Sequence, residues 1–113
     1  MTFKRFAAID FETADYGRDS ACAVSCVIAE DGKIAEKVYS LIRPPRREFV
    51  FSYLHGITWS HVAKKPTFPE LWPKLKTLLK GVDFIAAHNA SFDRGVLNAC
   101  CELDGTTPPN VKY

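Results

Sequence analysis

The dipeptide Asp31-Gly32 constrains this chain most, because it separates two stretches that both have strand-like composition. Residues 21–29 are apolar and partly β-branched, and residues 33–42 alternate between apolar and polar side chains. Aspartate followed by glycine tolerates the positive backbone angles of a two-residue hairpin turn. The pair therefore predicts an antiparallel hairpin. One face of its second strand is expected to carry Ile34, Val38 and Ser40.

The segments on either side of this hairpin add further strands and helices. Residues 6–12 and 82–88 are mostly apolar and predict two more strands. A short helix is expected at 60–63, and residues 111–113 read as the opening of another strand. The expected order β-β-β-α-β-α indicates an α/β domain in which helices pack on a mixed sheet.

Two longer helices have clear start signals. Thr67 and Glu70 form a capping-box pattern, and Gly81 ends the helix that follows them. Asn89 or Ser91 is placed to cap the second helix. An apolar stripe predicts the buried face of the first helix: Leu71, Trp72, Leu75, Leu78 and Leu79.

Composition indicates one small globular domain of 113 residues, with 47% hydrophobic residues and a net charge of only +2. No apolar run is long enough to span a membrane. The cysteines are Cys22, Cys26, Cys100 and Cys101, and no two of them form a Cys-x-x-Cys pair. We therefore expect buried thiols in a reducing, cytoplasmic compartment, with Cys22 and Cys26 on one face of a strand.

Asp10 and Glu12 end the first predicted strand and point to the same side of it. Two carboxylates so close together repel each other unless water or a hard cation separates them. The pair alone is weak evidence for a metal site, because an Asp-x-Glu on a solvent-facing strand is more often plain surface.

Two later segments, taken with Asp10-Phe11-Glu12-Thr13, make the pattern specific. They are residues 54–58, which contain His55-Gly56-Ile57, and residues 85–93, which contain His88-Asn89 and end in Asp93. The three motifs in this order resemble the DEDDh family of 3′–5′ exonucleases, which includes the proofreading epsilon subunit of bacterial DNA polymerase III. The resemblance runs from about residue 6 to about residue 97. It implies a ribonuclease H-like fold and hydrolysis of phosphodiester bonds at 3′ ends.

The resemblance also assigns roles to residues. It implies that Asp10 bridges two Mg²⁺ or Mn²⁺ ions, that Glu12 holds one of them and that Asp93 supports the other. Asp93 alternatively complements the dipole of a helix as a first-turn acid. The implied nucleotide-binding residues are Thr13, His55, Gly56, Ile57, Asn89 and Phe92. Of these, His55 alternatively caps local backbone, and Phe92 alternatively fills the core.

The chain departs from the family in one respect. The family's third motif is a histidine followed four residues later by an aspartate, and no histidine follows Asp93 here. We therefore interpret residues 1–113 as the N-terminal two-thirds of an exonuclease domain. Alone, it is expected to be nearly inactive and to self-associate through the exposed truncated edge, where the missing segment would otherwise cover apolar surface.

Two other classes of function compete with this interpretation. One is a non-catalytic nucleic-acid-binding module that retains the exonuclease fold. The other is a phosphoacceptor receiver domain, which the hairpin at Asp31-Gly32 disfavours because receivers alternate strand and helix from the start. The expected partners of an exonuclease are 3′ ends of single-stranded DNA or RNA, with association to a DNA polymerase; no membrane is expected.

Overall fold

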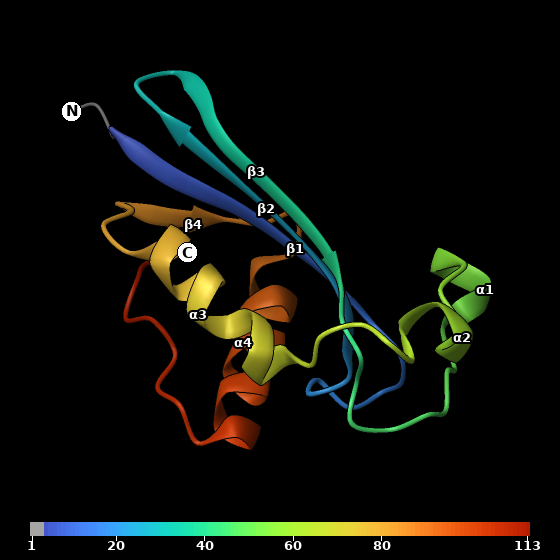
Figure 1. The fold of residues 1–113 in the computed structure, drawn as a ribbon. Helices are drawn as coiled ribbons and strands as arrows, with labels where there is room; N and C mark the ends of the chain where they lie inside the picture. Colours follow the sequence, from blue (N-terminus) through green and yellow to red (C-terminus); the bar gives the residue numbers. More distant parts are fainter. Residues whose placement is uncertain (1–3) are drawn as a thin grey trace.

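The computed structural model describes residues 4–113 and shows a four-stranded sheet with helices on one face and at one end (Figure 1). The strands are β1 (Arg5–Thr13), β2 (Ala21–Glu30), β3 (Lys33–Leu41) and β4 (Phe84–Ala86). The helices are α1 (Ser52–His55), α2 (Trp59–Val62), α3 (Phe68–Leu79) and α4 (Ala90–Asp104). No helix in this part of the chain is both long enough and apolar enough to cross a membrane.

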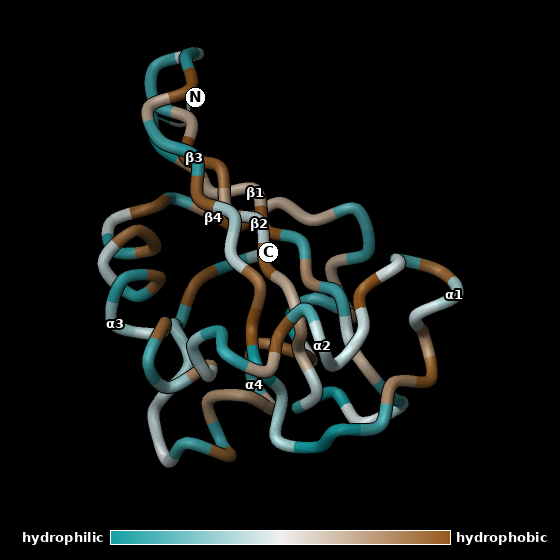
Figure 2. Tube along the Cα trace, turned by 45° about the vertical axis from the view of Figure 1, so that its right-hand side comes forward, coloured by the Kyte–Doolittle hydropathy of each residue, from teal (hydrophilic) through white to brown (hydrophobic). Residues whose placement is uncertain are grey.

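The strand order β3-β2-β1-β4 makes the sheet mixed. β1 pairs antiparallel with β2 and parallel with β4, as expected for a strand reached through a helix. The predicted hairpin is confirmed, and its turn has φ of 52° at Asp31 and 80° at Gly32. The hydrophilic tip of the hairpin extends away from the helices (Figure 2). The predicted α/β class is confirmed, and β4 lies beside β1 in the sheet.

The core lies between the sheet and helices α3 and α4. Ile9 and Phe11 of β1 are each 2% exposed, and Leu75 of α3 and Leu97 of α4 are fully buried with them. The predicted stripe of α3 is buried throughout, and the Glu70 carboxylate accepts the Thr67 backbone N–H at 2.9 Å, which confirms the capping box. Because Ile9 and Phe11 face the helices, Asp10 and Glu12 face the opposite side of the sheet.

Two β-bulges contradict the predicted face assignments. The register of β2 with β3 shifts between Ile28 and Ala29, so Ile34 pairs with Ala29 while Val38 pairs with Cys26. Ile34 is consequently 60% exposed, whereas Val38 packs against the core. The extra residue of a bulge reverses the alternation of side chains beyond it, and simple period-two counting misses this.

The second bulge separates the two cysteines of β2. The pairing of β1 with β2 shifts between Glu12 and Thr13, so Cys22 has no pairing partner in the ladder. Cys22 packs in a small second cluster with Ile57, and Cys26 lies in the main core. The prediction that both cysteines share a face is therefore wrong.

Other differences concern the ends of elements. β4 is shorter than the predicted strand at 82–88, and α1 was not predicted. Residues 111–113 form no strand, although the Lys112 carbonyl accepts the Ile85 N–H at 2.7 Å along the β4 edge. A single hydrogen bond does not make a ladder. At the other edge, β3 exposes most of its side chains.

Candidate active site

The two carboxylates of β1 line a pocket of about 440 Å³ on the face opposite α3 and α4. Asp10 and Glu12 are exposed there, and the buried Phe11 between them holds the strand against the core. Leu54, His55 and Ile57 line the same pocket. The structure thus brings the first two predicted motifs together, with acids on one wall and apolar side chains on another.

Asp93 lies in the first turn of α4 and is 2% exposed. β4 pairs with β1 only as far as Ala8, so the outer edge of β1 has no strand beside it at Phe11. The Oδ1 of Asp93 takes that place and accepts the Phe11 N–H at 3.0 Å. The third predicted carboxylate is therefore tied to the backbone between the other two.

The pKa of Asp93 is raised. Burial is the largest cause, the hydrogen bond from Phe11 opposes it, and the negative charges of Asp10 and Glu12 raise the pKa further. Asp10 and Glu12 are thus close enough to Asp93 to disfavour its charged form. Such a cluster of anions suits a cation, because hard divalent ions prefer carboxylate oxygens.

The fit to a metal ion is best for the β1 pair. In residues 4–113 no group of three or more His, Cys, Asp or Glu side chains is placed to hold a metal together. Asp10 and Glu12 offer exposed oxygens in one pocket, whereas the Oδ1 of the buried Asp93 already accepts the Phe11 backbone N–H. These two acids are the residues that would hold a divalent ion, and Asp93 supports the strand that carries them.

The start of α4 places the remaining residues of the third predicted segment. Asn89 is the N-cap and its carbonyl accepts the Phe92 and Asp93 N–H groups at 3.0 and 3.1 Å, but its side chain makes no capping bond. Phe92 is partly buried against the core, with the Arg18 guanidinium 6.0 Å from its ring centroid. Ser91 lies inside the helix and does not cap it.

His55 makes two hydrogen bonds to backbone, one from each ring nitrogen. Nδ1 accepts the Ile57 N–H at 3.0 Å, and Nε2 lies 2.9 Å from the Thr13 carbonyl. Gly56 adopts φ of 75°, which turns the chain back after α1, and Ile57 is only 9% exposed. Thr13 is 7% exposed. The observed contacts are those of the alternative interpretation, a loop histidine that caps backbone.

Sequence reasoning gave no role to several residues that line this pocket, among them Tyr39 and Leu54. Tyr39 on β3 and Leu54 on α1 both line it, and they are 66% and 69% exposed. Leu54 directly precedes His55, so its position next to the motif was a usable signal. Tyr39 reaches the pocket through strand pairing, which no local pattern reveals.

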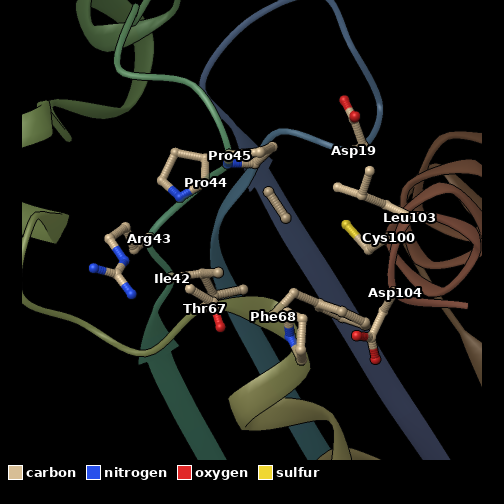
Figure 3. Close-up of a pocket in the computed structure, with 12 residues that line it drawn as sticks. Asp19, Ile42, Arg43, Pro44, Pro45, Thr67, Phe68, Cys100, Leu103 and Asp104 are labelled. Carbon is tan, nitrogen blue, oxygen red and sulfur yellow. The ribbon is translucent and has the colours of Figure 1, made fainter. Parts of the chain in front are cut away.

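The chain has other hollows. A shallow one is lined by Asp10 and His88, beside β4. Another, of about 230 Å³, lies between the loop after β3 and the start of α3, with Cys100, Leu103 and Asp104 of α4 on its far side (Figure 3). It is lined largely by apolar side chains, and it shares no residue with the pocket of Asp10 and Glu12.

Comparison with known proteins identifies the family of this chain. A profile of the RNase T family, described as Exonuclease, matches residues 7–108. The PolC-type DNA polymerase III of Thermotoga petrophila is 33% identical over 91 residues, which are 78% of this chain and 7% of the polymerase. The Thermotoga maritima protein of the same name is 32% identical over 91 residues.

Two solved structures share the fold. Exonuclease X in complex with 5′ overhanging duplex DNA has a TM-score of 0.68 at 34% identity, covering 80% of this chain and 52% of that one. The nuclease domain of 3′hExo, a DEDDh family member bound to rAMP, has a TM-score of 0.71 at 23% identity. That match covers 96% of this chain and 63% of the nuclease domain.

The fold is that of ribonuclease H-like nuclease domains, and this chain spans 52% and 63% of the two solved chains it matches. The chain belongs to the RNase T exonuclease family, and within it to the DEDDh group related to PolC exonuclease domains. The predicted resemblance is therefore confirmed. Members of this family use divalent metal ions.

Proposed function

We propose that this domain is a metal-dependent 3′–5′ exonuclease that removes nucleotides from the 3′ end of single-stranded DNA or RNA. One observation carries the proposal. Two exposed carboxylates, Asp10 and Glu12, share a pocket with the apolar side chains of Leu54 and Ile57. Acids can hold the cations that a phosphate needs, and apolar side chains can hold a base or sugar.

Each residue has a defined task in this mechanism. Asp10 and Glu12 are the residues that would hold divalent ions, which would supply the positive charge that a scissile phosphate needs. Asp93 keeps β1 in place through Phe11, so that the two acids keep their spacing. Ile57 and Leu54 contact the terminal nucleoside, whereas Asn89 and Phe92 act by shaping the start of α4. Bound divalent ions would acidify a water molecule and stabilise charge on the phosphate.

The general base is the remaining group that hydrolysis requires. No histidine follows Asp93. His88 is an imidazole that shares a hollow with Asp10. General-base catalysis typically contributes about 10²–10⁴-fold in rate. We therefore expect this chain alone to hydrolyse substrate slowly. The same observation favours the second candidate, a module that binds 3′ ends without cleaving them.

The partners follow from the same proposal. The relatives named PolC-type DNA polymerase III suggest that the domain works beside a polymerase. Four free, buried cysteines suit a reducing compartment such as the cytoplasm.

The test is a cleavage assay with 5′-labelled single strands in Mg²⁺ or Mn²⁺. Exonuclease action gives ladders shortened from the 3′ end, and a 3′-phosphate blocks it. Asp10→Asn should abolish both cleavage and Mn²⁺ binding by calorimetry. Glu102→Gln, at an exposed acid of α4 outside the pocket, should change neither. Cleavage of a circular strand contradicts the exonuclease proposal, and tight binding of 3′ ends without any product favours the binding module.

A further inference from the structure

His55 lies at the junction between β1 and the segment that forms the apolar wall of the pocket. The bulge after Glu12 interrupts the ladder of β1 with β2 just where Thr13 ends the strand. The Nε2 of His55 meets the Thr13 carbonyl at 2.9 Å, and its Nδ1 meets the Ile57 N–H at 3.0 Å. One ring therefore joins the residue after Glu12 to a residue of the apolar wall.

The two contacts determine the protonation state of the ring. An N–H can only donate, so Nδ1 must be unprotonated to accept from Ile57. A carbonyl can only accept, so Nε2 must carry the proton that Thr13 receives. The ring is thus the neutral Nε2–H tautomer, and neither nitrogen remains free to contact a substrate.

Further contacts seat the same segment. The Val50 N–H donates to the Ala14 carbonyl at 2.7 Å, and the Ser52 hydroxyl donates to the Ile57 carbonyl at 2.5 Å. Ile57 packs with Cys22 in the second cluster. These contacts hold the segment against the end of β1. Among residues 4–113, His55 is the only side chain whose hydrogen bonds connect Thr13 with Ile57.

We infer that His55 is a positioning residue for this site: its neutral ring fixes the apolar wall at Ile57 relative to the carboxylate of Glu12. The inference rests on the proposed function. It adds what fixes the distance between the acids and the apolar wall. The distance between the acids and the wall sets which phosphate lies at the acids when a nucleoside occupies the pocket. The ring does not itself touch the nucleotide.

The first experiment needs no substitution. Two-bond ¹H–¹⁵N correlation spectra of ¹⁵N-histidine protein at pH 8 report the tautomer of each ring. We expect Nε2–H for His55, unchanged when adenosine 5′-monophosphate and Mg²⁺ are added. An Nδ1–H ring, or a change of His55 tautomer when the nucleotide binds, overturns the inference.

The second experiment separates the two hydrogen bonds of His55, one at Nδ1 and one at Nε2. His55→Asn retains an acceptor near the position of Nδ1, His55→Gln retains a donor near that of Nε2, and His55→Ala retains neither. Exchange of the Ile57 amide should accelerate about tenfold in the Ala variant and stay slow in the Asn variant. The dissociation constant for the monophosphate should rise about tenfold in the Ala variant and less in the Asn and Gln variants. Equal weakening by all three overturns the positioning role.

His61 provides the matched control, because its Nδ1 also accepts a backbone N–H, from Thr58, the N-cap of α2, at 3.0 Å. His61 does not line the pocket. His61→Ala should therefore leave both the Ile57 amide and the nucleotide affinity unchanged. The amide measurement does not depend on catalysis, so a chain without nuclease activity still tests whether His55 positions Ile57. In that case the proposed function fails separately.

Discussion

Replacing Asp93 by asparagine and by alanine separates its two effects on the domain. The Oδ1 of Asp93 accepts the Phe11 N–H at 3.0 Å in a position that is 2% exposed. Asparagine keeps an oxygen acceptor there and removes the charge. Alanine removes both and leaves the Phe11 N–H buried without its partner.

The size of the effect follows from these contacts. A buried donor that loses its acceptor costs about 1–3 kcal/mol. We expect the alanine variant to be less stable than the asparagine variant by that amount, which lowers its Tm by roughly 5–15 °C. The pKa of Asp93 is raised, so the folded state loses stability as pH rises above the ordinary value of 3.8. The asparagine variant should therefore be at least as stable as the wild type at pH 7.

Urea denaturation with EDTA, followed by far-UV circular dichroism, measures these differences. Asp83 supplies the control, because its Oδ2 also accepts backbone N–H groups, from Lys4 and Arg5 at 3.0 and 3.1 Å, but at an exposed site. Water replaces that acceptor, so Asp83→Ala and Asp83→Asn should differ by less than about 1 kcal/mol. Equal stabilities of the two Asp93 variants would refute the role given to its hydrogen bond.

Two further predictions concern the loops around the site. The pKa values of Asp15 and Asp19 are lowered, chiefly by hydrogen bonds from Arg46, so this stabilisation is complete above the ordinary aspartate pKa of 3.8 and is lost as pH falls through the lowered values. Arg46→Ala should lower the free energy of unfolding by about 1 kcal/mol at pH 7, a modest value because the Arg46 side chain is 44% exposed. The difference in unfolding free energy between variant and wild type should shrink toward pH 3. A difference that stays constant with pH argues against the pairing. Gly56→Ala should cost about 1 kcal/mol through its φ of 75° and weaken binding of adenosine 5′-monophosphate, whereas Gly32→Ala, at φ of 80°, should cost the same without changing affinity, as calorimetry would show.

Local signals in the sequence predicted the parts of the fold that depend on neighbouring residues. The Asp31-Gly32 turn needs positive φ at both positions, and the Thr67–Glu70 box closes within one helical turn, so both follow from a few residues. The orientation of Ile34 could not be predicted, because a bulge depends on how two strands align. Period-two reasoning holds only as far as the register stays regular.

The candidate site likewise has parts that local sequence predicts and parts that it does not. The shared face of Asp10 and Glu12 follows from strand alternation alone. The partners of His55 and Asp93 lie 42 and 82 residues away in the sequence, at Thr13 and Phe11. Which backbone group a side chain reaches at such separations depends on where strands stop, and no pattern near His55 or Asp93 contains that information.

The open outer strand of the sheet has a consequence for the behaviour of the protein at high concentration. A strand with one unpaired edge is a template on which other molecules can add strands and build fibrils. Two copies of β3 that pair antiparallel along their whole length, Lys33 to Leu41, place Lys37 directly opposite its symmetry mate. Shifting the centre back by one residue places two Glu36 carboxylates opposite each other. Like charges in these positions repel, so the edge can face solvent without seeding aggregation.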